Sequence, residues 1–456
     1  MYLQRMNRAV AQNRPSPSQS VRGLIIAAPS SGSGKTTITL ALLRALRQSG
    51  VRVGSMKIGP DFIDPMYHQA ASGRACVNLD DWAMSQETFA RAVAQAAQDV
   101  DYVIAEGVMG LFDGSGSGRG STADVAARLG WPVILVLDVS SMAASAAALA
   151  RGFIDHRDDV NVLGVILNRL GSASHRDVIE RALAKSSVRV LGALQRDAEL
   201  VLPSRHLGLV QAGEHPQLHE FIDRAARWLA GGVDLDSIIE HAESSVLHET
   251  HENRQPLPAL GQRIAIARDA AFGFNYGLTI EGWRAQGASI EFFSPLANEA
   301  PPLDADAVYL PGGYPELHAQ RLGACRQFLN GVRVAAARGA CVYGECGGFM
   351  VLGDSLIDRD GTAHAMCGLL PVTTSFESPK MTLGYREVQL LENGPLGEIG
   401  AWYRGHEFHY ARIAMSDNAT QPLFKARNAA RDEIGTTGLR KGTVFGSFIH
   451  LVDRVD

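Results

Sequence analysis

The stretch GLIIAAPSSGSGKTTITLALLRALRQSG, at residues 23–50, constrains the fold of this 456-residue chain more than any other part of it. It joins a short apolar run to a glycine-rich loop and then to a segment whose apolar residues recur with helical spacing. Strand, loop and helix in this order are the context of a phosphate-binding loop, because backbone N–H groups and the helix N-terminus together form an anion site. The stretch therefore predicts a nucleotide-binding α/β domain with a parallel sheet.

The residues of this loop that we expect to bind nucleotide are Gly32, Ser33, Gly34, Lys35, Thr36 and Thr37. Lys35 is expected to reach the β- and γ-phosphates of ATP, and the hydroxyl of Thr36 is expected to bind Mg²⁺. The loop is a variant, because Pro29 stands where the usual pattern has its first glycine. GSGKTT between a strand and a helix is nevertheless a strong signal for a nucleotide site.

Two further strand ends carry acidic residues. Asp61 and Asp64 follow a strand in MKIGPDFIDPMYH, and Glu106 ends an apolar strand in DYVIAEGVMGLFDG. Ligands of open α/β sheets gather at the carboxyl ends of strands. We therefore expect Thr36 and Glu106 to hold Mg²⁺, since this ion prefers oxygen ligands, and Asp61 to lie at the same edge of the sheet. A helix cap or turn is the alternative role for each acid.

Asn168 ends the apolar run VILN in the same part of the chain. Its side-chain amide has the donor and the acceptor needed to bind the adenine edge of a nucleotide. An ordinary turn asparagine is the alternative, and the sequence does not choose between the two roles.

Short apolar runs alternate with longer helical segments over residues 21–232, which predicts a parallel sheet covered on both faces. A polar segment at 233–260 that ends in prolines is expected to be a linker. A second α/β series follows at 261–456 and becomes richer in strands towards its end. Residues 1–20 contain three arginines and no acid, and we expect them to form a disordered extension, with a transit peptide as the alternative.

The composition excludes several classes of function. A formal net charge of −5 provides no basic surface for nucleic acid or membrane lipids, and no uncharged apolar run is long enough to span a bilayer. The five cysteines lack CxxC spacing, so neither a disulfide framework nor a thiolate zinc site is indicated. We expect a cytoplasmic protein that acts on small molecules.

Cys346 lies in CVYGECGGFM, between an apolar run and a helical segment. The pattern Gly344-x-Cys346-x-Gly348 is that of a nucleophile elbow with cysteine in place of serine. Its glycines allow a sharp turn that presents the thiol at a helix N-terminus, where we expect the pKa of the thiol to be lowered. Cys346 is therefore the candidate nucleophile.

The same loop supplies a candidate oxyanion site. We expect the backbone N–H of Gly347 to bind the oxyanion, together with that of Gly313 in the stretch LPGGYPE.

A thiolate nucleophile needs a histidine base. Two candidates for that base lie downstream: the stretch RGHEFHY, and His450, which follows a strand-like run near the end of the chain. His406 and His409 lie in RGHEFHY, where the alternation predicts a strand rather than a metalloprotease helix. Their role is left open, with a position at the domain interface as one option.

The stretches LPGGYPE and YGECGGFM, followed by a late histidine, resemble the class I glutamine amidotransferases. The resemblance implies a flavodoxin-like α/β domain in which a cysteine attacks the side-chain amide of glutamine and releases ammonia. Those enzymes usually carry His-x-Glu, whereas Leu451 and Val452 follow His450 here. The resemblance therefore implies a dyad of Cys346 and His450, and the residue that orients His450 is left open.

Over residues 22–455 the chain resembles the a,c-diamide synthases of cobalamin biosynthesis, which amidate cobyrinic or hydrogenobyrinic acid. The resemblance implies an ATP domain like that of dethiobiotin synthetase ahead of the glutamine amidotransferase domain. It also implies ATP, L-glutamine, Mg²⁺ and a corrinoid acid as ligands. The stretches that carry it are APSSGSGKTT, KIGPDFIDPMYH, EGVMGLFDG, LPSRHLGLVQA, ARDAAFGFNY, LPGGYPE, YGECGGFM and RGHEFHY.

The implied reaction uses two sites. ATP would phosphorylate a carboxylate of the macrocycle, and ammonia made at Cys346 would displace the phosphate. Thr36, Asp61 and Glu106 would surround the Mg²⁺, and Asp64 is the candidate for positioning the substrate or the ammonia. Ser30 stands where partitioning-type ATPases carry an extra lysine, which argues against a dimerising switch.

Three alternatives stay open: a cobyric acid synthase, a synthase acting on nickel sirohydrochlorin, and a nucleotide-switched binding protein with an inactive glutaminase domain. LPSRHLGLVQA and GPDFIDP favour the a,c enzyme over the first. The joint presence of Cys346, His450, Lys35 and Glu106 argues against the last. The stretches SSGSGKTT and VNLDDWAMS resemble those of the enzymes that act on the metal-free ring, which favours hydrogenobyrinic acid as the substrate. The order of amidation, the ammonia path and the oligomeric state, with a homodimer as one option, are left open.

Overall fold

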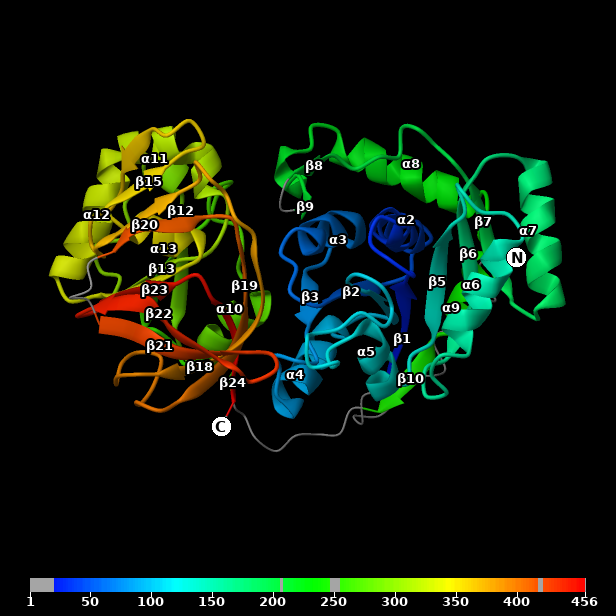
Figure 1. Cartoon of the computed structure of the whole chain (residues 1–456), viewed down its shortest axis with the longest axis horizontal. Helices are drawn as coiled ribbons and strands as arrows, with labels where there is room; N and C mark the ends of the chain where they lie inside the picture. Colours follow the sequence, from blue (N-terminus) through cyan, green and yellow to red (C-terminus); the bar gives the residue numbers. More distant parts are fainter. Residues whose placement is uncertain (1–19, 206–207, 247–254, 417–420, 456) are drawn as a thin grey trace.

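A computed structural model describes residues 20–205, 208–246, 255–416 and 421–455 of the chain. Two α/β units lie side by side, one formed by the N-terminal half of the chain and the other by the C-terminal half (Figure 1). The extension expected at residues 1–20 falls outside the described residues except for Ser20, which begins the first strand.

The first unit is a parallel sheet with strand order β3-β2-β4-β1-β5-β6-β7, to which β10 adds antiparallel to β1. The predicted α/β fold class is confirmed. Its strands are β1 (Ser20–Ala27), β2 (Val53–Ile58), β3 (Cys76–Leu79), β4 (Tyr102–Glu106), β5 (Val133–Asp138), β6 (Val162–Leu170), β7 (Val190–Gln195) and β10 (Glu243–Val246).

Alternate residues of β1 enter two different cores. Leu24 and Ile26 are buried with α2, α3 and α8, whereas Ile25 and Ala27 are buried with α4 to α7 on the opposite face. Both faces of the strand are therefore apolar, as a buried parallel strand requires. The helices are α2 (Lys35–Gln48), α3 (Asp64–Ser72), α4 (Gln86–Ala96), α5 (Thr122–Leu129), α6 (Ser145–Ile154), α7 (Ala173–Lys185) and α8 (Leu218–Ala230).

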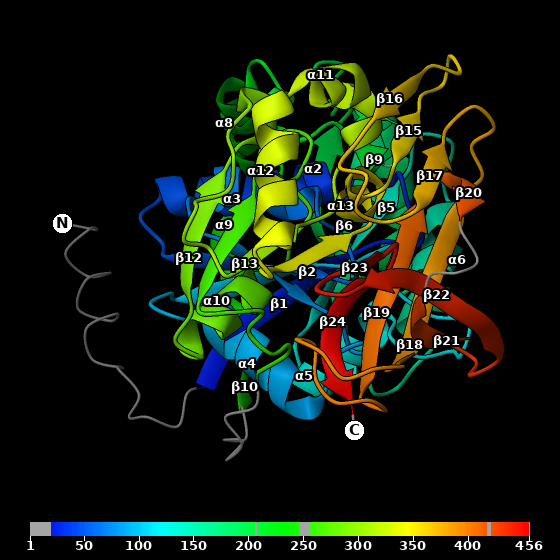
Figure 2. The same ribbon diagram turned by 90° about the vertical axis from the view of Figure 1, so that its left-hand side faces the viewer.

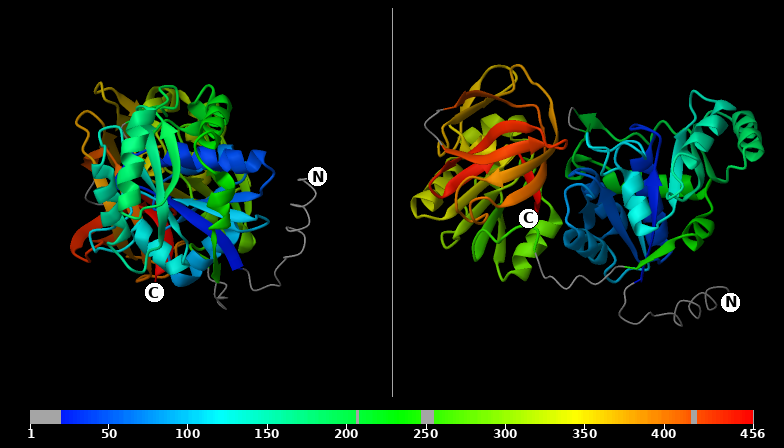
Figure 3. Two further views of the ribbon diagram at one scale, coloured as in Figure 1. Left: turned by 90° about the vertical axis from the view of Figure 1, so that its right-hand side faces the viewer. Right: turned by 60° about the horizontal axis from the view of Figure 1, so that its bottom comes forward.

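Two features of this unit differ from the sequence prediction. The first unit includes part of the segment expected to be a linker at 233–260, because α9 (Leu235–Glu240) packs on this unit and β10 pairs with β1. Strand β3 was not predicted, because it is only four residues long and contains Asn78. It forms the edge of the sheet that faces the second unit, opposite the edge that carries α7 (Figures 1 and 3).

The second unit contains a larger mixed sheet with strand order β12-β11-β13-β14-β23-β22-β21-β18-β19-β24. The first five strands in this order are parallel and the others antiparallel. The strands are β11 (Arg263–Ala267), β12 (Ser289–Phe293), β13 (Ala307–Leu310), β14 (Cys341–Glu345), β18 (Thr382–Leu390), β19 (Trp402–His409), β21 (Gln421–Asn428), β22 (Glu433–Lys441), β23 (Val444–Ser447) and β24 (His450–Val455).

A small second sheet, β16-β15-β17-β20, lies beside α13 in this unit (Figure 2). Helices α11 to α13 cover one face of the large sheet and α10 the other. The bounds are β15 (Ser355–Ile357), β16 (Ala363–Ala365), β17 (Val372–Ser375), β20 (Arg412–Ser416), α10 (Gly277–Ala285), α11 (Ala319–Ala324), α12 (Arg326–Ala337) and α13 (Gly347–Leu352).

Hydrogen bonds fix the two units against each other near the β3 edge. The hydroxyl of Tyr385 donates to Asp80 Oδ2 at 2.9 Å, and the backbone N–H of Ser85 donates to Asp453 Oδ2 at 2.7 Å. This contact brings the carboxyl ends of β1, β2 and β4 close to β19 and β24. None of the helices in the described part of the chain is long and apolar enough to cross a membrane.

Candidate active site

The glycine-rich loop joins β1 to α2, and a hydrogen bond from Asn168 fixes its position. The side-chain Nδ2 of Asn168, at the end of β6, donates to the carbonyl oxygen of Ser33 at 2.9 Å. Gly34 caps α2 in the left-handed region, with φ of 93°, and a Cβ there would lie 2.3 Å from that Nδ2. The glycine is therefore needed both for the turn and for the close approach of Asn168.

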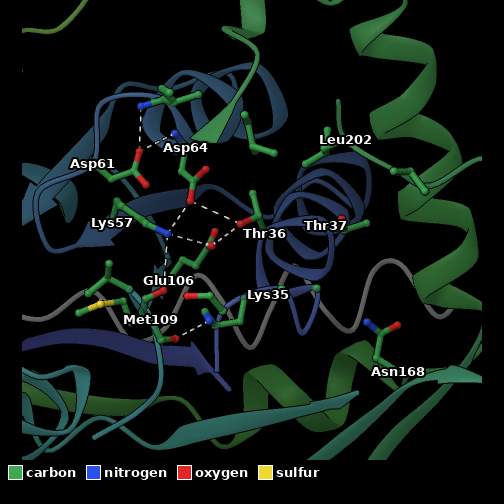
Figure 4. Close-up of a pocket in the computed structure, with 18 of the residues that line it drawn as sticks. Lys35, Thr36, Thr37, Lys57, Asp61, Asp64, Glu106, Met109, Asn168 and Leu202 are labelled. Carbon is green, nitrogen blue, oxygen red and sulfur yellow. Dashed lines mark hydrogen bonds and ion pairs between the residues drawn. The ribbon is translucent and has the colours of Figure 1, made fainter. Parts of the chain in front are cut away.

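Lys35 begins α2 and is buried. Its Nζ donates to the carbonyl oxygen of Met109 at 2.5 Å and to that of Ser30 at 3.2 Å (Figure 4). Burial disfavours the charged ammonium and lowers the pKa of Lys35 to about 8, although Glu106 acts in the opposite direction. A phosphate bound in the loop would place negative charge beside this ammonium and so stabilise its charged form.

Thr36, Lys57, Asp64 and Glu106 form one buried polar cluster beside the loop (Figure 4). The hydroxyl of Thr36 donates to Glu106 Oε1 at 2.6 Å. The ammonium of Lys57 lies between two carboxylates, 2.5 Å from Asp64 Oδ2 and 3.0 Å from Glu106 Oε1. The cluster therefore brings together Thr36, Asp64 and Glu106, three of the residues predicted to act here.

The two carboxylates differ in how readily they accept a proton. Burial raises the pKa of Glu106, but Lys57, His68 and Thr36 outweigh that effect and hold the pKa well below its usual range. For Asp64, burial and the neighbouring Asp61 raise the pKa to about 7, against the effect of Lys57. Glu106 is thus a permanent anion, whereas Asp64 can exchange a proton near neutral pH.

His68 supports Glu106 from the far side of the cluster. Its Nε2 lies 2.6 Å from Glu106 Oε2, and its Nδ1 lies 3.4 Å from Cys76 Sγ. Burial lowers the pKa of His68, but Cys76 and Glu106 outweigh it and raise the pKa to about 10. His68 is therefore a second buried cation that fixes the Glu106 carboxylate.

Asp61 does not join this cluster as a direct partner of Thr36 or Glu106. Its Oδ1 accepts hydrogen bonds from the backbone N–H of Ile63 at 2.8 Å and of Asp64 at 2.9 Å, and so caps the start of α3. Across the described ranges, no group of three or more His, Cys, Asp or Glu side chains has the geometry to hold a metal ion. Thr36 Oγ1 and the Glu106 carboxylate do suit Mg²⁺, which binds through one or two protein oxygens plus phosphate oxygens and water.

Lys57 was missed in the sequence. It is the only charged residue of β2, a six-residue strand whose side chains are all buried. A lysine is almost never fully buried unless it is paired. A single lysine in a run that otherwise predicts a buried strand was the signal that could have identified it.

Cys346 lies at the sharp turn between β14 and α13. Its φ is 46° and its ψ is −102°, and its N–H donates to the carbonyl oxygen of Ser447 at 2.8 Å. A non-glycine residue at positive φ is uncommon and is concentrated at functional sites. The backbone of the predicted nucleophile elbow is therefore present, at a position where the side chain is 3% exposed.

The expected effect on the pKa of this thiol was wrong in direction. Burial, with a contribution from Glu316, raises the pKa of Cys346, and the N–H of Gly347 opposes this only weakly. Helix α13 has six residues, and its N-terminal charge does not compensate for the loss of solvent. The thiol is therefore protonated in this arrangement and needs a base.

The two predicted oxyanion amides come close together. A Cβ on Gly347 would lie 3.1 Å from the backbone N of Gly313, which belongs to the loop after β13. A Cβ on Gly312, in the same loop, would lie 2.3 Å from His450 Cε1. This loop thus lies between the residue after Cys346 and the ring of His450.

His450 begins β24 and is buried next to His406. The two histidines are paired across β19 and β24, and their rings stack with centroids 5.0 Å apart and an interplanar angle of 11°. Tyr276 hydrogen-bonds to His406 Nε2 at 2.6 Å. Burial and His450 keep the pKa of His406 well below its usual range, so His406 is neutral. His409 stacks on Phe448 instead, with centroids 3.9 Å apart.

Glu345, directly before the cysteine, is a second residue that the sequence analysis missed. It is buried, and its Oε2 lies 3.7 Å from His450 Nδ1. Tyr309 and Tyr343 each donate a hydroxyl to its carboxylate at 2.7 Å. An acidic residue at the end of an apolar strand was the available signal, and it was used for Glu106 but not here.

One cavity of about 920 Å³ has residues of both units in its wall. Its wall includes Lys35 and Glu106 at one end and His406 and His450 at the other. Phe62, from the loop that carries Asp61, packs its ring 4.8 Å from that of His450. The cavity is at the upper end of the range for ligand pockets, about 300–1,000 Å³. Asn168 and Thr37 also line it.

Two family models match the chain, one for each unit. The model of the CobQ/CobB/MinD/ParA nucleotide binding domain matches residues 24–210. The model of the CobB/CobQ-like glutamine amidotransferase domain matches residues 263–454. The predicted order, an ATP domain followed by a glutamine amidotransferase domain, is therefore confirmed.

Curated relatives match over nearly the whole length. The hydrogenobyrinate a,c-diamide synthase of Rhizobium meliloti (strain 1021) is 52% identical over 95% of this chain and 99% of its own. The enzyme of the same name from Brucella anthropi is 50% identical, again over 95% and 99%. Among solved structures, the septum site-determining protein MinD complexed with Mg-ADP from Pyrococcus horikoshii OT3 is 17% identical over 45% of this chain and 93% of that chain, with a TM-score of 0.30, too weak a likeness for an argument.

Relatives that are about half identical over 95% of this chain show the family to which it belongs. The phosphate-binding loop, the cysteine turn and the two domain matches agree with it. The chain belongs to the family of hydrogenobyrinate a,c-diamide synthases.

Proposed function

We propose that the protein is a carbon–nitrogen ligase that uses ATP and glutamine to amidate the a and c carboxylates of hydrogenobyrinic acid, in cobalamin biosynthesis. The first unit activates the carboxylate as an acyl phosphate, and the second releases ammonia from glutamine. The observation that carries the proposal is the single cavity that extends from Lys35 to His450.

The glutaminase half begins with a proton transfer. Because burial raises the pKa of Cys346, the thiol attacks only as His450 removes its proton. The sulfur adds to the amide carbon of glutamine, and the N–H groups of Gly313 and Gly347 stabilise the oxyanion. His450 returns the proton to the leaving nitrogen, which departs as ammonia, and water then hydrolyses the glutamyl thioester.

The ligase half is a phosphoryl transfer followed by a substitution. The loop amides of Gly32, Ser33 and Gly34 and the ammonium of Lys35 bind the phosphates of ATP. A substrate carboxylate oxygen attacks the γ-phosphorus and ADP leaves, which gives an acyl phosphate. Ammonia then adds to the acyl carbon and inorganic phosphate leaves, which gives the amide.

Side chains of the cluster have separate tasks in this half. Mg²⁺ bound with ATP supplies positive charge at the phosphates, and Thr36 Oγ1 and Glu106 are the side chains placed to hold it. Asp61 is the third predicted ligand and acts indirectly, by capping α3. Asp64, with a pKa of about 7, can take the proton that ammonia loses as it forms the amide. Asn168 and Thr37 are expected to contact the nucleotide.

The metal-free ring is the proposed substrate because both relatives carry hydrogenobyrinate in their names. All five cysteines are free thiols, which suits a reducing compartment, so we propose the cytoplasm as the place of the reaction.

To test this, the full-length protein is incubated with ATP, Mg²⁺, glutamine and either hydrogenobyrinic acid or cobyrinic acid. Mass spectrometry then counts the carboxylates that have been converted to amides. Two conversions, faster on hydrogenobyrinic acid, are expected. Conversion of further carboxylates on a ring that is already diamidated would identify a cobyric acid synthase. ATP hydrolysis without amidation of either ring would contradict the proposal.

Cys346→Ala separates the proposal from a nucleotide-switched binding protein. The variant should lose amidation with glutamine and keep it with ammonium chloride, because the ligase site is untouched. If the variant fails with both nitrogen donors although its fold is retained, the assignment of two separate sites is wrong.

A further inference from the structure

One ring nitrogen of His450 has no hydrogen-bond partner among the described residues. His450 is 2% exposed, and its Nδ1 makes no hydrogen bond to any described residue. A neutral histidine that acts as a base through Nε2 carries its proton on Nδ1, and an acceptor at Nδ1 fixes that tautomer. Burial without such an acceptor is unusual for a polar atom.

The nearest carboxylate is that of Glu345, whose Oε2 lies 3.7 Å from Nδ1. This carboxylate is itself fixed by three donors. The hydroxyl of Tyr309 donates to Oε2 at 2.7 Å, and the hydroxyl of Tyr343 donates to Oε1, also at 2.7 Å. The backbone N–H of Leu451, next to His450, donates to Oε1 at 3.2 Å. Both oxygens of the carboxylate are therefore held in place by hydrogen bonds.

The other groups around His450 cannot take this role. Val452 stands at the position two residues after the histidine. The ring of His406 stacks face to face on that of His450, so it does not meet Nδ1 in the ring plane, and its Nε2 is already bound to Tyr276. Phe62 contributes only an apolar ring from the first unit.

We propose that Glu345 positions His450, by accepting the Nδ1 proton so that Nε2 faces the Cys346 thiol. The inference rests on the proposed glutaminase reaction. The gap of 3.7 Å is longer than a hydrogen bond, and catalytic hydrogen bonds are often long before substrate binds and shorten in the complex. Glu345 and Cys346 are adjacent at the end of β14, so one strand end carries both the nucleophile and the acid that orients its base.

This role has a consequence for charge during the reaction. When His450 takes the thiol proton it becomes an imidazolium ion in a buried place, and the Glu345 carboxylate offsets that charge. Of the other titratable groups nearby, His406 on β19 stacks on His450, and Tyr276, ahead of α10, hydrogen-bonds to His406. Tyr309 on β13 and Tyr343 on β14 hydrogen-bond to Glu345. Tyr276, Tyr309 and Tyr343 have pKa values raised by burial and stay neutral.

The test is Glu345→Gln in the full-length protein, which keeps the size of the side chain and removes its charge. With glutamine as donor, kcat should fall about 100-fold or more, while the KM for glutamine changes less than about threefold. Amidation with ammonium chloride should stay at the wild-type rate. Amidation with ammonium chloride also tests the ligase. If the wild-type protein amidates with neither donor, the result contradicts the proposed function rather than the role of Glu345.

The pH profile of the glutaminase reaction separates positioning from a structural role. In Glu345→Gln the acidic limb of kcat/KM should move to lower pH, because removing negative charge beside the ring disfavours its protonated form. Glu345→Asp should keep more activity than Glu345→Gln. The matched control is Glu387→Gln, another buried glutamate of this unit, which is paired with Arg404 and should leave the limb in place.

Two results would overturn the inference: wild-type kcat with glutamine in Glu345→Gln, or an unmoved acidic limb. If Glu345→Gln does not fold, Tyr343→Phe replaces it and removes one donor to the carboxylate without removing its charge. That variant should lower glutamine-dependent kcat several-fold and leave ammonium-dependent amidation unchanged. Equal loss with both donors would contradict the inference.

Discussion

The ring of Phe62, from the ATP-binding unit, lies 4.8 Å from the ring of His450, in the glutaminase unit. Phe62 is also 5.3 Å from Phe274 and 5.5 Å from His406. It is therefore the one described contact that joins the loop of Asp61 directly to the proposed catalytic base. If the loop moves when substrate binds, the contact between the rings of Phe62 and His450 would transmit that displacement to His450.

Phe62→Ala should uncouple the two reactions. Without the ring, glutamine hydrolysis no longer depends on the state of the ligase loop, and ammonia escapes from the cavity. Glutamate formed per amide should rise several-fold above the wild-type value, while ammonium-dependent amidation is kept. The control is Phe112→Ala, which removes a ring that stacks on Phe153 within the first unit. An unchanged ratio in Phe62→Ala would contradict the coupling.

Lys57→Met should destabilise the fold. The lysine is the buried partner of Asp64 and Glu106, and its removal leaves Asp64 without a cation and Glu106 with His68 alone. The free energy of unfolding, measured with urea, should fall by about 3–5 kcal/mol. Lys425→Met is the control, because Lys425 pairs with Glu433 at the surface and should contribute less than about 1 kcal/mol. Equal effects of the two substitutions would show that Lys57 does not hold the cluster together.

His68 should make stability depend on pH. Its pKa is raised from 6.5 to about 10, so the folded state binds its proton more tightly than the unfolded state. The stabilisation is complete below about pH 6.5 and is lost as pH rises through about 10. The difference in unfolding free energy between wild type and His68→Gln should therefore shrink over that range. A difference that is constant with pH would mean that His68 is not a buried cation.

Gly312→Ala should disable the glutaminase alone. The new Cβ would lie 2.3 Å from His450 Cε1, so the ring has to leave its position. Glutamine-dependent amidation should fall about 100-fold, and ammonium-dependent amidation should remain. Gly277→Ala is the control, because a Cβ at Gly277 meets no atom within 4 Å. Retained glutamine use in Gly312→Ala would place the base elsewhere.

Much of the architecture could be predicted because it follows from local pattern. Apolar runs such as GLIIAA and ACVYGE are strands in the structure, and the turn at Cys346 follows from the glycines around it. The approach of Thr36 to Glu106 follows from the rule that the carboxyl ends of parallel strands share one edge. These inferences need only neighbours in sequence or a fixed property of the sheet.

The parts that were missed depend on three-dimensional packing. The pKa of Cys346 is raised by burial, which the sequence of a turn does not report. Lys57 and Glu345 acquire their roles from partners on other strands. Phe62 meets His450 only because the two units pack along the β3 edge. Side-chain chemistry at a strand end could be predicted, but its partners across the sheet could not.

We propose that ammonia released at Cys346 passes His450 and reaches the acyl phosphate through the cavity that both His450 and Lys35 line. The direct measurement supplies glutamine labelled with ¹⁵N in its amide, together with an excess of unlabelled ammonium chloride, and determines the label in the corrinoid product by mass spectrometry. The new amides should keep the label despite the excess. Dilution of the label in proportion to the free ammonium would contradict it, because the two sites would then exchange ammonia through the solvent.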